Sequence, residues 1–161
     1  MKIAIIGAGL SGLTLAKRLA DTHDVSVYEK ARGPGGRMST RRADPFAFDH
    51  GAQYFTVETD RFEAFLSPFR VSGLMTPWPK DIAQVGGARL SDKEKLVAAP
   101  GMNSICKALA ADLTLHTQAH IDYLKRDGEH WFLVDKKGEE IGPFDWVIAS
   151  APSVQTAALF P

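Results

Sequence analysis

The sequence has very little cysteine, no long apolar run and no net charge. Cys106 is the only cysteine among 161 residues, which excludes an intrachain disulfide framework and a cysteine-based metal site. Since no stretch of about 18 apolar residues occurs, no membrane-spanning helix is expected. Lysine plus arginine and aspartate plus glutamate both number 19, so the overall charge favours neither nucleic acid nor an anionic membrane as partner. We therefore expect a globular cytoplasmic protein that binds neither nucleic acid nor a membrane.

A strand–helix–strand unit is predicted at the start of the chain. Residues 3–6 are a continuous apolar run that ends in glycine, which is typical of a strand buried on both faces. Residues 10–20 place apolar side chains at helical spacing, and residues 25–28 are β-branched and aromatic. Together they have the size of a βαβ crossover. This pattern predicts a Rossmann-like α/β fold.

The turn between the first strand and the helix has the pattern G-x-G-x-x-G at residues 7–12. In this context Gly7 permits the tight turn, Gly9 leaves room for a pyrophosphate, and Gly12 lets the helix pack closely on the strand. The N–H groups and the positive dipole end of the helix then face the phosphates. The turn therefore predicts a dinucleotide site, with Ser11 as an additional hydroxyl donor.

An acid at the end of the second strand bears on which dinucleotide binds. Glu29 can accept hydrogen bonds from the ribose hydroxyls, and its charge repels a 2′-phosphate, which disfavours NADP. Arg32 could offset that repulsion by pairing with the phosphate. NAD and FAD both remain open at this point.

A second glycine pair favours FAD. Gly35 and Gly36 allow close backbone approach, and Arg37 can neutralise pyrophosphate charge or hold the ribityl side of a flavin. NAD binding does not need such a loop, whereas a longer, bent cofactor would run past it.

The rest of the chain predicts an α/β mixture with an antiparallel insertion. Further strands are predicted at residues 46–49, 95–98, 113–117, 121–124, 131–134 and 146–149. Helices are predicted from Thr59 to Phe69 with Asp60 as the N-cap, from Asn103 as the N-cap to about Ala111, and from Ser153 as the N-cap to Leu159. Gly128 and Gly138 mark hairpin turns, and residues 72–92 are expected to be irregular.

Two motifs together resemble a known family. These are Gly33-Pro34-Gly35-Gly36-Arg37-Met38-Ser39-Thr40 and Phe48-Asp49-His50-Gly51-Ala52-Gln53-Tyr54-Phe55. They resemble the renalase-type branch of the flavin amine-oxidase superfamily. Support comes from Pro100-Gly101-Met102-Asn103-Ser104-Ile105, which resembles the turn before that family's middle helix, and from the strand ending in Pro152.

The resemblance implies an FAD/NAD(P)-binding superfamily fold, non-covalent FAD and transfer of reducing equivalents to oxygen. Renalases oxidise isomers of reduced nicotinamide dinucleotides, whereas wider relatives oxidise amines, and the motifs leave both substrate classes open. The implied cofactor-binding residues are Gly7, Ala8, Gly9, Ser11, Gly12, Glu29, Lys30, Arg37, Met38, Gly51, Ala52, Gln53, Tyr54 and Ala119. The first five would hold the pyrophosphate, Glu29 and Lys30 the adenosine ribose, and Ala119 would lie near the adenine. Arg37 and Met38 would line the cofactor channel, and residues 51–54 would lie beside the isoalloxazine.

The histidines predict no metal site. His116 and His120 have the spacing of a metal pair on a helix, but their segment is predicted to be a strand without an accompanying carboxylate motif. His50 lies near the expected reacting end of the flavin, with a structural hydrogen bond favoured over direct catalysis.

The resemblance also predicts the domain organisation. We expect residues 1–57 and 97–161 to form the FAD-binding domain and residues 58–96 to form an insertion that faces the substrate side. Renalase-like proteins are longer, and their second half carries a Gly-Asp motif that this sequence lacks. We therefore expect that half of the fold to be absent and FAD affinity and turnover of the chain alone to be weak or absent. An NAD-dependent dehydrogenase and a non-catalytic dinucleotide-binding module are the alternatives.

Overall fold

The computed structural model, which describes residues 1–78 and 93–160, divides the chain into two compact units. The first unit combines Met1–Arg37 with Cys106–Pro161, and the second spans Met38–Ile105. The second unit begins earlier and ends later than the insertion expected at 58–96. It does so because the segment from residue 38 onward makes its backbone pairings inside that unit, for example between Phe55 and Leu96.

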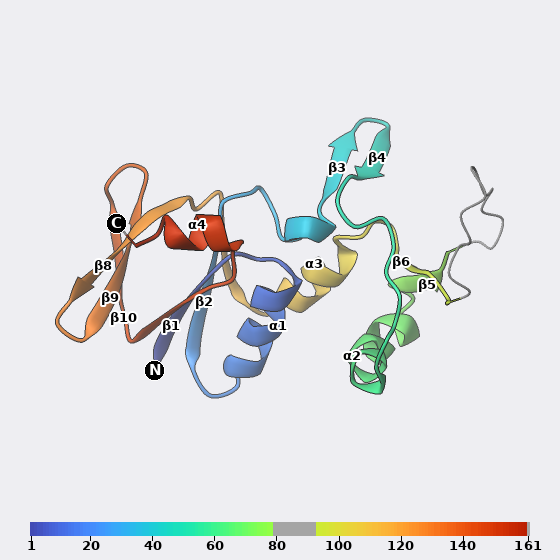
Figure 1. The fold of residues 1–161 in the computed structure, drawn as a ribbon, viewed down its shortest axis with the longest axis horizontal. Coiled ribbons are helices and arrows are strands. Elements are labelled where there is room, and N and C mark those ends of the chain that lie inside the picture. The colour runs from blue at the N-terminus through green and yellow to red at the C-terminus, as the bar shows by residue number, and fades with distance from the viewer. Residues whose placement is uncertain (79–92, 161) are drawn as a thin grey trace. The chain divides into compact units, whose positions relative to one another are not determined.

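A parallel sheet forms the centre of the first unit (Figure 1). In the described residues its strand order is β11 (Trp146–Ala149), β1 (Lys2–Ile6), β2 (Asp24–Glu29) and β7 (Thr114–Thr117). Each neighbouring pair is parallel. Helix α1 (Leu10–Leu19) connects β1 to β2. The Rossmann-like strand–helix–strand unit expected from the sequence is therefore confirmed.

The apolar periodicity explains why these elements form. Ala4 and Ile5 of β1 are fully buried, as expected for a strand covered on both faces. On α1, Leu13 and Ala16 lie on the buried side, with Lys17 and Arg18 in the last turn, where cations interact favourably with the helix dipole.

An antiparallel sheet completes the first unit and confirms the expected β insertion. Its strands in the described residues follow the order β10 (Glu140–Phe144), β9 (His130–Asp135), β8 (Ile121–Asp127). The turns at Gly128 and Gly138 have φ values of +58° and +81°, which favour glycine.

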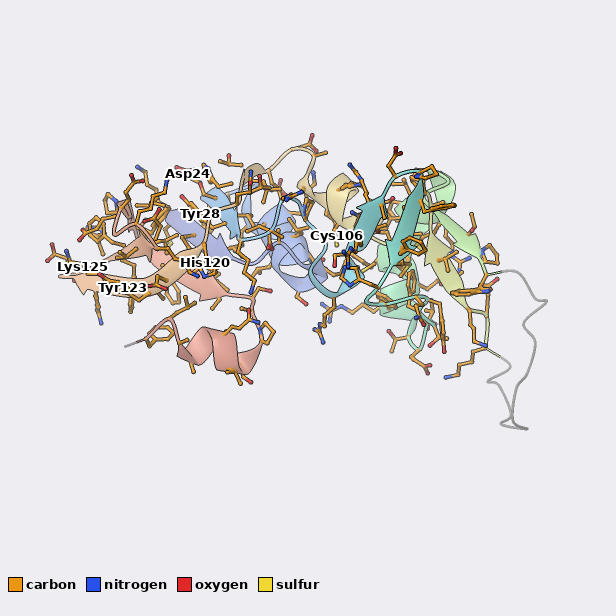
Figure 2. The ribbon with its side chains drawn as sticks, turned by 90° about the horizontal axis from the view of Figure 1, so that it is seen from above. Asp24, Tyr28, Cys106, His120, Tyr123 and Lys125 are labelled. Atoms are coloured by element: carbon orange, nitrogen blue, oxygen red, sulfur yellow. The ribbon has the colours of Figure 1, made fainter. Side chains whose placement is uncertain are left out.

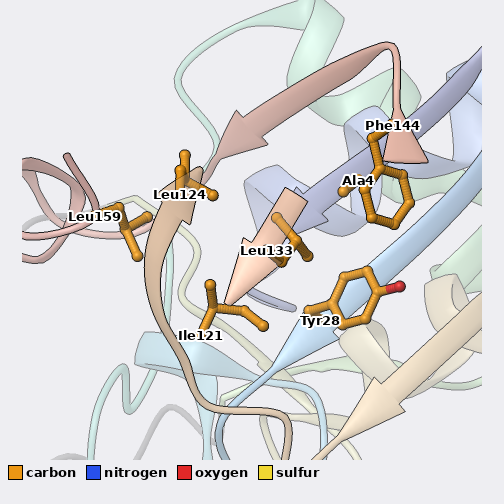
Figure 3. Close-up of a cluster of buried hydrophobic side chains, with 7 residues drawn as sticks. All are labelled: Ala4, Tyr28, Ile121, Leu124, Leu133, Phe144 and Leu159. Carbon is orange, nitrogen blue, oxygen red and sulfur yellow. The ribbon is translucent and has the colours of Figure 1, made fainter. Parts of the chain in front are cut away.

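A buried apolar cluster joins the two sheets (Figure 3). Ala4 and Tyr28 come from the parallel sheet, whereas Leu133 and Phe144 come from the antiparallel one. The remaining buried members are Ile121, Leu124 and Leu159. The antiparallel sheet thus covers one face of the parallel sheet and shares a core with it.

The second unit contains two hairpins and a helix. One hairpin pairs β3 (Thr40–Ala43) with β4 (Phe46–Asp49), and the other pairs β5 (Met75–Pro77) with β6 (Leu96–Ala98). Helix α2 is Asp60–Val71. A 3-10 turn, η1 (Gly36–Met38), and helix α3 (Ser104–Ala110) lie at the borders between the units. Strand β5 falls in the segment expected to be irregular, and residues 79–92 of that segment lie outside the described residues.

Two predicted helix caps are wrong. Helix α2 is capped by Thr59, whose side chain accepts a hydrogen bond from the Phe62 N–H, and Asp60 is the first helical residue. A hydroxyl one residue earlier reaches the free N–H groups of the first turn better than Asp60 does from inside it. Helix α4 (Ser153–Ala157) has Pro152 at the N-cap position without a side-chain cap, so Ser153 is not the cap.

Candidate functional site: the glycine turn after the first strand

The turn from β1 into α1 requires glycine at two positions. Gly7 has φ +107°, and its N–H donates to the Tyr28 carbonyl oxygen at 2.8 Å, which ties the turn to β2. At Gly12 a Cβ would lie 2.2 Å from the Gly7 carbonyl oxygen and 3.2 Å from the Ser150 Cβ. A side chain at position 12 would thus push α1 off the turn.

The N-terminus of α1 is open to an anion. Gly9 occupies the N-cap position in an extended conformation and makes no side-chain cap, and the first turn contains no acidic residue. Its carbonyl oxygen accepts the Leu13 N–H at 3.0 Å, which starts the helix. The preceding N–H groups and the positive dipole end can therefore serve a phosphate. Ser11 is exposed beside them.

The second glycine loop runs alongside this turn. The Gly35 N–H donates to the Ala8 carbonyl oxygen at 2.9 Å, and Gly9 and Gly35 form a parallel bridge. A Cβ on Gly36, which has φ +53°, would lie 3.1 Å from the Gly9 Cα. Arg37, the residue that follows Gly36, is exposed. The two glycine motifs, which are separate in the sequence, thus lie side by side and form one site lined by backbone.

Glu29 is fixed at the end of β2 by backbone hydrogen bonds. It is only 7% exposed, and its two carboxylate oxygens accept the N–H groups of Ala8 and Ala31, each at 2.8 Å. The carboxylate therefore braces the glycine turn. Each oxygen retains a second lone pair for a ribose hydroxyl.

Tyr28 precedes Glu29 on the same strand and belongs to the buried apolar cluster. Its ring stacks on His116 of β7 with a centroid distance of 4.7 Å and an interplanar angle of 14°. Burial raises the pKa of the Tyr28 phenol, a hydrogen bond with Ser26 opposes the rise, and the charge of Asp24 adds to it. Figure 2 shows Asp24 and Tyr28 on β2. The phenol thus stays protonated at neutral pH.

The corner between β7 and β8 lies against the residues around Glu29. The Ala119 N–H donates to the Glu29 carbonyl oxygen, and the Gln118 N–H donates to the Ala31 carbonyl oxygen, both at 2.9 Å. Gln118 has φ +57°, which is uncommon for a residue other than glycine. The structure therefore brings the expected adenine contact near Ala119 next to Glu29.

Lys30 points to a partner that was not expected. Its Nζ donates to the Gln155 Oε1 of α4 at 3.0 Å. Ser150, which packs against Gly7 and Gly12 through its carbonyl and side chain, is a second residue that sequence reasoning missed. Both contacts join segments far apart in the chain, and the only available signal was the strand ending in Pro152.

Cys106 lies behind the second glycine loop and is inert. It is fully buried, with its Sγ 3.9 Å from the Gly35 carbonyl oxygen. Burial raises its pKa to about 11, so the thiolate that would act as a nucleophile is scarce at neutral pH. Cys106 thus acts as a small buried apolar residue.

The remaining predicted residues belong to the second unit. Met38 is buried, whereas Gly51, Ala52, Gln53 and Tyr54 follow β4 in an irregular segment. His50, at the start of that segment, lies 3.3 Å from the Ser39 Oγ through its Nε2.

A hydrogen-bond network anchors the strand that leads into this segment. The Asp49 Oδ1 accepts the Thr40 hydroxyl at 2.5 Å and the Met102 N–H at 3.0 Å. Gly101 lies close by, and a Cβ there would come 2.9 Å from the Thr40 Oγ1. Asp49 thus ties the hairpin β3–β4 to the turn before α3 and sets where residues 50–54 begin.

A groove of about 510 Å³ lies elsewhere, at the amino end of β1. Its lining residues are Met1, Lys2, Thr22, His23, Asp24, His130, Pro143 and Asp145. Since the glycine turn follows the carboxyl end of β1, where ligands of such sheets bind, the groove is not the dinucleotide site.

The described residues contain neither a metal cluster nor a membrane-spanning helix. No group of three or more histidine, cysteine, aspartate or glutamate side chains there could hold a metal ion. None of the helices in the described ranges is long and apolar enough to cross a membrane.

The features of the first unit define a dinucleotide-binding Rossmann-like domain. In agreement, residues 5–69 match the family model described as "NAD(P)-binding Rossmann-like domain". The chain is also similar to curated desaturases in part of its sequence and to a solved structure in its fold.

Two curated relatives are similar to parts of this chain. A 4,4'-diapophytoene desaturase of Staphylococcus haemolyticus is 31% identical over 128 residues, which cover 77% of this chain and 25% of the relative. The enzyme of the same name from Staphylococcus aureus strain Newman is 50% identical over 52 residues, or 32% of this chain and 10% of the relative. The chain thus spans about a quarter or less of the length of these relatives.

The fold is shared with a putative protoporphyrinogen oxidase from Exiguobacterium sp. 255-15. The two structures superpose with a TM-score of 0.69 over 98% of this chain and 61% of that chain, at 12% sequence identity. This likeness confirms the α/β dinucleotide-binding fold.

Proposed function

We propose that this chain binds FAD and supplies the adenosine and pyrophosphate side of the cofactor site in a renalase-type oxidoreductase. The observation that carries the proposal is the backbone site where the uncapped N-terminus of α1 meets the second glycine loop. Its open N–H groups fit the two phosphates of a dinucleotide. The loop that follows adds the cation Arg37, which a longer cofactor would use.

Each protein group has a defined role in this proposal. The first-turn N–H groups of α1 bind the pyrophosphate, with Gly7, Ala8, Gly9, Ser11 and Gly12 shaping the turn. Glu29 accepts ribose hydroxyls while its bonds to Ala8 and Ala31 hold it in place, and the backbone near Ala119 faces the adenine. Arg37 neutralises phosphate charge. Met38, Gly51, Ala52, Gln53 and Tyr54 line the flavin side.

The chemistry follows from the cofactor. Bound at this site, FAD would supply the hydride acceptor, with oxygen as the final electron acceptor and hydrogen peroxide as the product. The protein orients the substrate and excludes water, so no nucleophilic side chain is required. We propose as substrate either an isomer of a reduced nicotinamide dinucleotide or an amine, acted on in the cytoplasm. The desaturase and oxidase names of the relatives support a redox role.

One observation favours an alternative, in which the site binds NAD. The matching family model is described as binding NAD(P), so the same turn could hold NAD in a dehydrogenase or in a non-catalytic module. The close approach of Gly35 and Gly36 to the turn speaks for FAD, because an NAD site does not need it.

Flavin titrations test the proposal. We expect weak, saturable quenching of flavin fluorescence by the chain with FAD, and none with FMN, which lacks the adenosine monophosphate part. NAD should compete poorly. Equal binding of NAD and FAD, or binding of FMN, would contradict the proposal.

A glycine variant separates the ligand from the fold. In G9A the added Cβ would meet only the Gly36 Cα, at 3.9 Å, which is ordinary contact. We expect the unfolding midpoint to stay near wild type and FAD affinity to fall at least tenfold, because the methyl group fills the phosphate position. The control is G33A, whose Cβ meets nothing within 4 Å and which should leave FAD affinity unchanged without lowering the unfolding midpoint.

A further inference from the structure

Residues 150–160, the α4 segment, are fixed to the rest of the first unit at both ends. At one end the Ser150 N–H donates to the Ile6 carbonyl oxygen at 2.8 Å, directly beside the glycine turn. At the other end the Leu159 carbonyl oxygen accepts the Leu124 N–H at 2.8 Å, and the Leu159 side chain lies in the buried cluster. The α4 segment therefore connects the carboxyl end of β1 to the antiparallel sheet.

A single polar contact joins the middle of the α4 segment to the end of β2. The Thr156 hydroxyl donates to the Ala151 carbonyl oxygen at 3.1 Å, which holds the short helix in place. Val154 is 81% exposed, whereas the Oε1 of the next residue, Gln155, accepts a hydrogen bond from the Lys30 Nζ at 3.0 Å. Because both ends of the segment are anchored, the Gln155 amide is brought to Lys30 by the fold.

The backbone around Lys30 is fixed independently of this contact. Glu29, which precedes it, accepts the N–H groups of Ala8 and Ala31 through its carboxylate, each at 2.8 Å. The Ala31 carbonyl oxygen accepts the Gln118 N–H at 2.9 Å. The long side chain of Lys30 still has to be ordered, and a lysine loses much rotamer entropy when a ligand immobilises it. The bond to Gln155 orders that side chain without a ligand.

The Glu29 carboxylate and the Lys30 ammonium contact different neighbours at the end of β2. The carboxylate is bonded to Ala8 of the glycine turn, whereas the ammonium is bonded to Gln155 of α4. A ribose that lies across the end of the strand can therefore donate a hydroxyl proton to the carboxylate and accept one from the ammonium. The bond to Gln155 uses one of the three ammonium donors, so the ribose can accept from another.

We propose that Gln155 is a positioning residue of the nucleotide site: by accepting a hydrogen bond from Lys30 it holds the ammonium against the adenosine ribose. Because the lysine is ordered in advance, ligand binding costs less side-chain entropy. The inference rests on the proposed function, which assigns the adenosine side of the cofactor to this chain. It concerns the adenosine diphosphate group, which FAD and NAD have in common, and adds α4 to the elements that bind it.

Calorimetric titration of the whole chain with ADP tests this inference through a double-mutant cycle. K30M removes the donor and should weaken ADP binding about tenfold. Q155A leaves the lysine in place but releases its side chain, and should weaken ADP binding about fivefold. In the K30M background Q155A should have no further effect, because Gln155 acts only through Lys30. Q155E, which keeps the oxygen acceptor, should bind ADP nearly as wild type does.

The control is V154A, which changes the exposed neighbour of Gln155 on the same helix and should bind ADP as wild type does. Circular dichroism should show Q155A to be folded. The inference is wrong if wild type does not bind ADP, if K30M or Q155A binds it as wild type does, or if Q155E binds it as weakly as Q155A. An equal loss from Q155A with and without Lys30 would also overturn it, since a merely structural role gives that result.

Failure of this cycle and failure of the flavin titration are distinguishable. If the site holds NAD instead of FAD, the flavin titration fails, but the ADP cycle still shows the coupling between Gln155 and Lys30. If FAD binds as proposed and Q155A binds ADP as wild type does, the role of Gln155 alone is refuted.

Discussion

Replacing Gly12 with alanine should destabilise the protein in the absence of any ligand. The added Cβ would lie 2.2 Å from the Gly7 carbonyl oxygen and 3.2 Å from both the Cβ and the Oγ of Ser150. Ser150 can turn its hydroxyl away, but the Gly7 carbonyl is backbone that is tied to Tyr28. Helix α1 must therefore move away from β1, which loosens the packing of Leu13 and Ala16.

The size of the effect follows from the cost of overpacking. Inserting a methyl group into a packed site costs about 1–3 kcal/mol, and the backbone contact in G12A places it near the upper end, at about 3 kcal/mol. For a chain of 161 residues, each kcal/mol shifts the melting temperature by about 2–4 °C. The expected fall in melting temperature is thus about 6–12 °C.

Thermal unfolding followed by circular dichroism measures this change, with G33A as the matched control. No atom lies within 4 Å of the Cβ position at Gly33, so that variant should melt with wild type or gain about 0.4–1 kcal/mol from a less flexible unfolded chain. If G12A and G33A melt alike, α1 does not pack on the turn as closely as described, and the role assigned to Gly12 is wrong.

Two further predictions concern a helix cap and a buried thiol. T59A should lower the free energy of unfolding by about 1 kcal/mol in urea denaturation because it removes the cap of α2. D60A should lower the free energy of unfolding by less. The opposite order would show that Asp60 is the cap. Burial raises the pKa of Cys106 from 9.0 to about 11, so the stability from its buried thiol is complete below pH 9 and is lost as the pH rises through 11. Across that pH range, urea denaturation should show a steeper fall in the free energy of unfolding for wild type than for C106A. Parallel curves would refute the raised pKa of the buried thiol.

Local sequence patterns predicted most elements of the first unit. The βαβ unit, its glycine turn and the hairpins at Gly128 and Gly138 each depend on residues close together in the sequence. The apolar period and the need for positive φ are visible there without tertiary information.

Elements whose stability comes from distant partners were missed. Strand β3 lies in an arginine-rich stretch that reads as a loop and exists because it pairs with β4. Strand β10 contains Gly142 and Pro143, which hid it, and its pairing with β9 shifts register between Ile141 and Phe144. Within the site, the contacts of Lys30 with Gln155 and of Gly12 with Ser150 cross most of the chain. No local pattern encodes such pairings.

The pairing of β1 with β11 has a consequence for biosynthesis. Residues 3–6 acquire their partners on that side only when residues 146–149 have been made, and Ser150 then closes behind the glycine turn. On the ribosome, the first strand must wait with one edge open while all the residues between are synthesised. An apolar strand with an unpaired edge is prone to aggregation, and closing so long a loop slows folding. The glycine turn, although encoded early, therefore reaches its final form only after residues 146–150 have been made.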